Sequence, residues 1–118
     1  MTTFLGRDSR ADDHIDDLVA RGYDVRVVDA STAGTDKATV LREFATALAL
    51  PRWFGHNWDA LLDCLRDLES GDGRPVALVW DHVRALRDSD RHTYADVIDI
   101  LEQVEGERDD LRVTVIAR

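Results

Sequence analysis

Residues 75–80 read Pro75-Val-Ala-Leu-Val-Trp80, an apolar run with the length of one β-strand. A strand without polar positions must be covered on both faces, which is typical of a parallel sheet packed with helices. Two further stretches predict strands, the β-branched run at 24–29 and Leu111-Arg-Val-Thr-Val-Ile116 near the C-terminus. The sequence therefore predicts a sheet of three strands.

The connections between these strands carry apolar residues three and four positions apart, which is the period of a helix. Five helices are expected, at residues 10–21, 37–50, 58–70, 82–87 and 91–105. Side chains suited to capping a helix start stand before three of them: Thr35 or Asp36, Asn57, and Asp90. Long helical connections make the strands parallel. We expect an α/β fold, a three-stranded parallel sheet packed with helices, in one domain over 1–118 whose first 22 residues form a helical extension.

Composition excludes several classes of protein. The chain has 118 residues, with 24 Asp and Glu against 15 Lys and Arg, and a formal net charge of −9. This charge disfavours binding to nucleic acid or to an anionic membrane, since both need Lys and Arg. Cys64 is the single cysteine, so no internal disulfide can form. No apolar run reaches the ~18–20 residues of a membrane span, and the first residues lack the order of a signal peptide. We expect a cytoplasmic location.

The stretch at 50–68 carries the candidate chemistry. Asp59, Asp63 and Asp67 lie four positions apart and stack on one helix face. Like charges at this spacing destabilise a helix by ~0.2–0.5 kcal/mol per pair. The loop before the helix is formed by Trp53, Phe54, Gly55 and His56. Carboxylates beside large aromatic side chains can dock into a basic cleft in place of phosphates, but a chain rich in acids also acquires such a stripe on a solvated face.

Catalytic and metal sites find little support in this stretch. His56, Asp59 and Asp63 converge near one helix start, yet nothing else supplies a ligand set. Cys64 and His56 fall on different turns, which suits a buried cysteine better than a nucleophile with its base. Neither a P-loop nor a dinucleotide-binding glycine motif is present. We therefore expect no enzyme activity, no cofactor and no metal.

The run over residues 50–65 resembles the signature of the barstar family, intracellular inhibitors of microbial ribonucleases. The residues that carry the resemblance are Leu50, Pro51, Trp53, Phe54, Gly55, Asn57, Asp59, Ala60, Leu61, Asp63, Cys64 and Leu65. It continues in Leu78-Val-Trp80 and Val113-Thr-Val-Ile116 and covers roughly residues 24–118. It implies three parallel strands and four helices, in agreement with the pattern above. The helix at 10–21 lies outside the family pattern.

The resemblance also implies a mechanism, in which the 58–70 helix and the loop before it plug the active site of a secreted microbial ribonuclease. Asp63 would be the central carboxylate against the Arg and His groups of the enzyme, with Asp59 beside it, and Trp53 would stack on a catalytic His. Leu62 stands where a Trp is common. The implied partner-binding set is Asp63, Asp59, Trp53, Asn57, Gly55, Phe54, Leu62, His56, Asp67 and a late-helix acid, Glu102 or Glu105. A monomer in a 1:1 complex is expected.

A second interpretation stays open. The same fold can serve as an immunity protein or as a regulatory module with a partner that is not a ribonuclease. The additional segment at 1–22 and the replacement at Leu62 favour this alternative.

Overall fold

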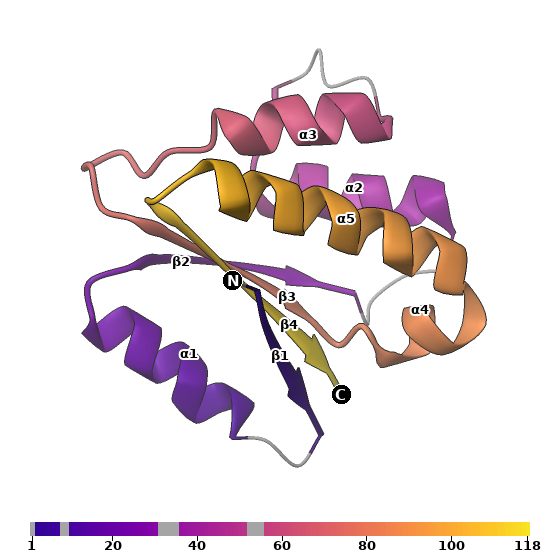
Figure 1. Cartoon of the computed structure of the whole chain (residues 1–118), viewed down its shortest axis with the longest axis horizontal. Coiled ribbons are helices and arrows are strands. Elements are labelled where there is room, and N and C mark those ends of the chain that lie inside the picture. The colour runs from indigo at the N-terminus through magenta and orange to yellow at the C-terminus, as the bar shows by residue number, and fades with distance from the viewer. Residues whose placement is uncertain (1, 8–9, 31–35, 52–55) are drawn as a thin grey trace.

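The computed structural model describes residues 2–7, 10–30, 36–51 and 56–118. Within them four strands form one parallel sheet in the order β1-β4-β3-β2 (Figure 1). The strands are β1 (Thr3–Gly6), β2 (Asp24–Asp29), β3 (Val76–Asp81) and β4 (Leu111–Ala117). The α/β class and the parallel sheet are as predicted, and all three predicted strands form at the expected places to within one residue.

Five helices surround the sheet within the described ranges: α1 (Ala11–Ala20), α2 (Lys37–Ala47), α3 (Trp58–Arg66), α4 (Arg84–Ser89) and α5 (Arg91–Glu107). Figure 1 shows α1 on one face of the sheet and the other helices on the opposite face, with α3 outermost. The predicted N-terminal helix is therefore present. None of the helices in the described parts of the chain is long and apolar enough to cross a membrane.

The prediction of three strands was wrong, because β1 adds a fourth. This strand has only four residues, three of them exposed, so neither alternation nor an apolar run marks it in the sequence. It pairs parallel to β4 in the register Thr3 to Thr114. Without it, the apolar end of β4 would be an open sheet edge, which proteins normally cover. The pairing with the edge of β4 therefore accounts for this strand better than the strand propensity of its own residues.

The core follows from the alternation of side chains along β3, whose six residues are all buried. Leu78 and Trp80 belong to the larger apolar cluster under α2, α3, α4 and α5. Ala77 and Val79 belong to a second cluster, with Ala11 and Leu18 of α1. The apolar run at 75–80 predicted a strand covered on both faces, and helices do cover both faces of β3.

Two helices end earlier than predicted. The expected helix 37–50 stops at Ala47, and the expected helix 58–70 stops at Arg66. At the end of α3, Arg108 donates from Nη1 to the carbonyl oxygens of Leu65, at 2.9 Å, and Arg66, at 3.4 Å. A helix leaves its last carbonyls without partners, and here a side chain from 43 residues further along the chain supplies one. The local pattern carries no sign of this contact.

Candidate partner-binding surface

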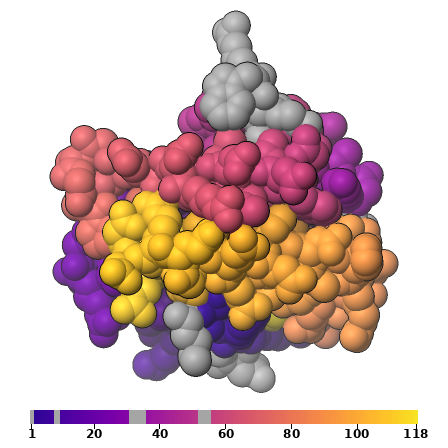
Figure 2. Space-filling view, turned by 45° about the horizontal axis from the view of Figure 1, so that its top comes forward, coloured from indigo at the N-terminus to yellow at the C-terminus, as the bar shows by residue number. Residues whose placement is uncertain are grey.

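The start of α3 is fixed by Asn57, as predicted. Its extended backbone precedes the helix, and its Oδ1 accepts a hydrogen bond from the Ala60 amide at 2.8 Å. One side of the helix then inserts Leu61, Cys64 and Leu65 into the core. Burial of these three side chains leaves the opposite side of α3 facing outward, and Figure 2 shows the helix lying across the surface beside α5.

The outward side of α3 carries the predicted carboxylates. Asp59 and Asp63 are exposed, and Asp67 is also exposed but is the C-cap residue rather than part of the helix. The Asp63 side chain is 69% exposed, and Nη1 of Arg66 lies 3.7 Å from its Oδ1. That distance is too long for a hydrogen bond. Asp63 therefore presents its charge to the solvent and not to the core.

Arg66 is held away from Asp63 by a second acid. Its Nε and Nη2 donate to the two carboxylate oxygens of Glu107 in α5, each at 2.9 Å. These hydrogen bonds raise the pKa of Arg66 and hold the pKa of Glu107 below its ordinary value. Such a bidentate pair orients the guanidinium toward α5. Arg66, which forms a long ion pair with Asp63, is thus already engaged with Glu107, so it offsets the negative face of α3 only partly.

The neighbouring members of the expected set have different surroundings. His56 is exposed, with φ of +51°, directly before the cap residue. Leu62 is half-buried and packs against the core at the rim of the helix. Glu102 is exposed on α5, the helix beside α3. These positions leave all three side chains at least partly accessible. Trp53, Phe54 and Gly55 lie outside the described residues.

Glu105 does not belong to this surface. Its residue is only 7% exposed. Its Oε1 accepts a hydrogen bond from the Thr2 hydroxyl at 2.7 Å, and its Oε2 accepts one from the Val113 amide at 2.8 Å. The expectation that Glu105 contacts a partner is therefore wrong, because its carboxylate is buried and hydrogen-bonded to Thr2 and to Val113 of β4. Glu102 remains as the accessible acid of the two.

Catalytic and metal chemistry is not favoured at α3. Cys64 is buried, and that burial raises the pKa of its thiol, with Asp63 and Asp67 acting in the same direction. A thiol in such surroundings stays protonated and is a poor nucleophile. In the described ranges, which include His56, Asp59 and Asp63, no three His, Cys, Asp or Glu side chains gather as a metal site.

Two contacts that hold the surface in place were not anticipated from the sequence. Arg108, which satisfies the end of α3, stands directly after the last residue of α5. Lys37 of α2 places its Nζ 5.1 Å from the centre of the Trp58 ring, a cation–π contact at the start of α3. Trp58 is half-buried at the edge of the core. Neither contact has a signal in sequence spacing.

The fold and this surface define an α/β protein with a parallel sheet, whose outermost helix presents an anionic face. Sequence comparison matches residues 23–117 to the barstar family, which is described as barnase inhibitor. The chain therefore belongs to the barstar family, whose members are inhibitors and not enzymes. A comparison with curated proteins finds no significant match. Residues 1–22, with β1 and α1, precede the matched region.

Proposed function

We propose that this protein inhibits a microbial ribonuclease of the barnase type by inserting the anionic face of α3 into the enzyme's active site. The observation that carries the proposal is the outward position of Asp63 on α3, in a chain of the barstar (barnase inhibitor) family. A ribonuclease must bind the phosphates of RNA, so its active site offers Arg, Lys or His groups. The carboxylates of α3 would take the places of those phosphates.

The central contact assigned to Asp63 is a set of charge-assisted hydrogen bonds. Its carboxylate can accept hydrogen bonds from several donors at once, and bonds between ionised groups are stronger than neutral ones. Asp59 lies one turn earlier, and Asp67 lies just past the helix end. Together they extend the negative face along α3, while Glu102 on α5 adds one more accessible acid.

The rigid attachment of α3 also favours tight binding. Asn57 caps its start, Arg108 closes its end, and Arg66 joins it to Glu107 of α5. A surface that is already ordered loses little conformational entropy when a partner binds. The inhibitor would therefore dock with its carboxylates in place rather than fold upon the enzyme.

The remaining contacts of the proposal are carried by the family resemblance. Trp53 would stack on a catalytic His of the enzyme, with Phe54 and Gly55 beside it. His56 and Leu62 would lie at the rim of the same contact. Asn57 would contribute through the position that it gives to the helix start.

The decisive experiment compares Asp63→Asn with Asp16→Asn in the inhibition of a panel of barnase-type ribonucleases. Both variants remove one negative charge without changing side-chain size, but Asp16 is an exposed residue of α1 on the other face of the sheet. Hydrogen bonds to charged groups contribute ~1.5–3 kcal/mol, so Asp63→Asn should raise the inhibition constant by at least about tenfold. Asp16→Asn should change it less than about twofold. Equal effects of the two variants, or no inhibition of any enzyme in the panel, would overturn the proposal.

A second candidate is an immunity or regulatory protein that binds a partner other than a ribonuclease. The observation that favours it is the segment at 1–22, which adds a strand and a helix beyond the matched region. Deleting this segment would uncover Ala77, Val79 and Ile116, so a surface change is the better test. Val19→Asp on the exposed side of α1 should leave ribonuclease inhibition intact if the first proposal holds. A partner that is lost with Val19→Asp and retained with Asp63→Asn would favour the second.

A further inference from the structure

The N-terminal strand closes one side of a hollow that has no part in the surface on α3. The hollow has a volume of about 430 Å³, within the range of sites that hold small molecules. Its lining comes from β1 and the residue after it, the end of β4, α4 and the first turn of α5. The residues are Phe4, Leu5, Gly6, Arg7, Arg84, Arg87, Tyr94, Val115 and Ala117. Four of these nine precede the region that matches the barstar family, so β1 completes the site.

The hollow lies next to the carboxyl ends of β1 and β4. Gly6 and Ala117 are the last residues of β1 and β4, and they are register partners. In open α/β sheets, ligands are bound beyond the carboxyl ends of the strands. The hollow borders these strand ends, and Phe4 and Val115 extend its lining along the sheet on the side of α4 and α5.

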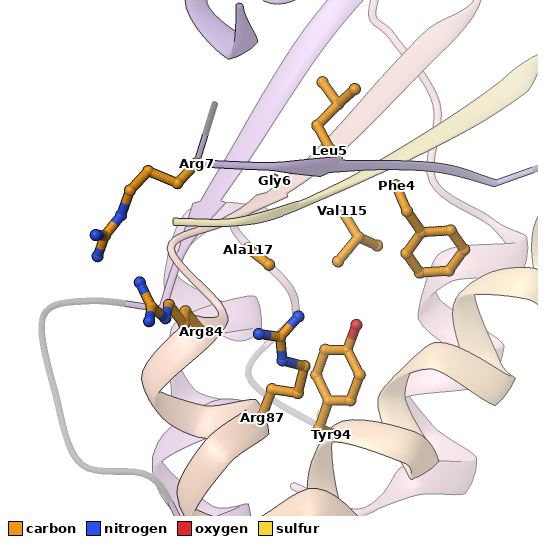
Figure 3. Close-up of a pocket in the computed structure, with 9 residues that line it drawn as sticks. All are labelled: Phe4, Leu5, Gly6, Arg7, Arg84, Arg87, Tyr94, Val115 and Ala117. Atoms are coloured by element: carbon orange, nitrogen blue, oxygen red, sulfur yellow. The ribbon is translucent and has the colours of Figure 1, made fainter. Parts of the chain in front are cut away.

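One end of the hollow concentrates positive charge in a protein whose net charge is −9. Figure 3 shows the guanidinium groups of Arg7 and Arg84 pointing toward one another, while that of Arg87 lies below Ala117 and beside the Tyr94 ring. Arg84 and Arg87 share the carboxylate of Asp88, at Nε–O distances of 3.8 and 3.5 Å. Both distances exceed a hydrogen bond. Among the described residues, Arg84 and Arg87 thus keep hydrogen-bond donors for an anion, and Arg offers them in the forked geometry that suits phosphate.

The other end of the hollow is aromatic and apolar. Phe4 is 53% exposed on the strand, and Val115 of β4 lies beside it (Figure 3). The Tyr94 ring is held by stacking on Trp80, with ring centres 5.7 Å apart and planes 18° apart, and its hydroxyl points into the hollow. An exposed Phe beside a fixed Tyr offers a surface on which a planar ring can stack.

We propose that this hollow binds a mononucleotide, with the phosphate at Arg7, Arg84 and Arg87 and the base against Phe4 and Tyr94. The two ends match the two parts of such a ligand, a phosphate and a flat aromatic base. A single nucleotide fits better than an RNA strand, because the acidic remainder of the protein would repel further phosphates. The site is independent of the proposed inhibition, since it shares no residue with the surface on α3.

The test is calorimetric titration of the full chain at low ionic strength with AMP, GMP, CMP and UMP, with adenosine, and with inorganic phosphate. At least one mononucleotide should bind one site per chain, at least about tenfold more tightly than adenosine or inorganic phosphate. A preference for inorganic phosphate, or no saturable binding at millimolar concentrations, would overturn the proposal. Binding that is equal for adenosine and AMP would do so as well, because the arginines would then have no role.

Variants locate the site. Arg84→Gln and Arg87→Gln should each weaken nucleotide binding by about tenfold or more, since each removes charged donors to the phosphate. The matched control is Arg112→Gln, an exposed arginine at the opposite end of β4, which should leave binding unchanged. Phe4→Leu keeps the strand apolar and should reduce the advantage of the nucleotide over inorganic phosphate. Equal losses for Arg112 and Arg84, or an unchanged nucleotide preference in Phe4→Leu, would contradict the assignment.

Ribonuclease inhibition serves as an independent measurement on the same variants. Because Arg84 and Arg87 lie away from α3, both variants should inhibit a ribonuclease as well as the unchanged chain does. Loss of nucleotide binding with intact inhibition is the expected combination. If no nucleotide binds, the proposed inhibition is not affected. If no ribonuclease is inhibited, the proposed nucleotide site is not affected.

Discussion

The carboxylate of Glu105 joins parts of the chain that are far apart in sequence. It accepts hydrogen bonds from the hydroxyl of Thr2 near the N-terminus and from the amide of Val113 in β4. A buried carboxylate is tolerated only where hydrogen bonds replace the water it has lost. This side chain therefore holds the segment before β1 against α5 and the sheet, and its role is structural.

Glu105→Gln should lower the free energy of unfolding by ~1–3 kcal/mol, because the amide cannot accept on both sides and a buried donor is left unsatisfied. Glu102→Gln is the control, since Glu102 is exposed on the same helix and should change stability by less than ~0.5 kcal/mol. Urea unfolding followed by circular dichroism measures both. Equal losses would show that the contacts of Glu105 contribute nothing specific.

At the scale of elements, α3 depends on its cap for its position. Asn57→Ala removes the acceptor of the Ala60 amide and should cost about 1 kcal/mol of stability. Asn57→Asp keeps an acceptor and adds a negative charge at the positive end of the helix dipole. It should be as stable as the unchanged chain or more so. The urea midpoints of the two variants measure this difference. An equal loss of stability in both variants would contradict a capping role for Asn57.

The helix α1 is part of the folded structure and not an appendage. Leu18 is 7% exposed and packs into the cluster with Ala77 and Val79, whereas its neighbour Val19 is 58% exposed. Leu18→Ala should cost about 2 kcal/mol or more, because it leaves a cavity against the sheet. Val19→Ala should cost less than ~0.5 kcal/mol. Thermal unfolding of the pair measures the difference, and similar melting temperatures would show that α1 is not packed as described.

At the scale of the whole molecule, several carboxylates couple stability to pH. Hydrogen bonds from Thr39 and Thr93 hold the pKa of Asp36 and Asp90 below the ordinary value of 3.8. Hydrogen bonds from Arg26 and Arg108 do the same for the pKa of Asp24 and Asp110. A pKa lowered in the folded state gives stability that is present above the unfolded pKa and lost as the pH falls through the folded pKa.

The urea midpoint should therefore fall as the pH drops from about 4 toward 2. The combined variant Asp36→Asn and Asp90→Asn keeps both helix caps but cannot titrate at these positions. Its stability should depend less on pH in that window. A dependence as steep as that of the unchanged chain would contradict the assignment to the capping carboxylates.

The net charge of −9 should also affect how fast a ribonuclease is bound. Salt screens charges over about 10 Å at 0.1 M and about 3 Å at 1 M. Association with a cationic active site should slow as salt is added, and Asp63→Asn should show a weaker salt dependence. Stopped-flow fluorescence measures the rates. An association rate that does not change with salt would contradict charge-guided docking.

The sequence by itself determined the strands at 24–29, 75–80 and 111–116, the existence and order of the five described helices, and the caps at Asn57 and Asp90. It did not determine where each helix begins and ends, and it left Thr35 or Asp36 as alternative caps before α2. The features that it determined follow from local periodicity and from the chemistry of single side chains. It also predicted that Asp59 and Asp63 share one face of α3, because helical spacing fixes that relation. The motif at 50–65 indicated the family, and the family match agrees.

Tertiary structure alone decided the features that depend on distant contacts. β1 pairs with the edge of β4, Arg108 satisfies the last carbonyls of α3, and Thr2 and Val113 donate hydrogen bonds to the buried carboxylate of Glu105. Each of these contacts joins residues that are brought together only by the completed sheet and its helices. Their energy comes from long-range burial and hydrogen bonding, which leave no period or motif in the local sequence.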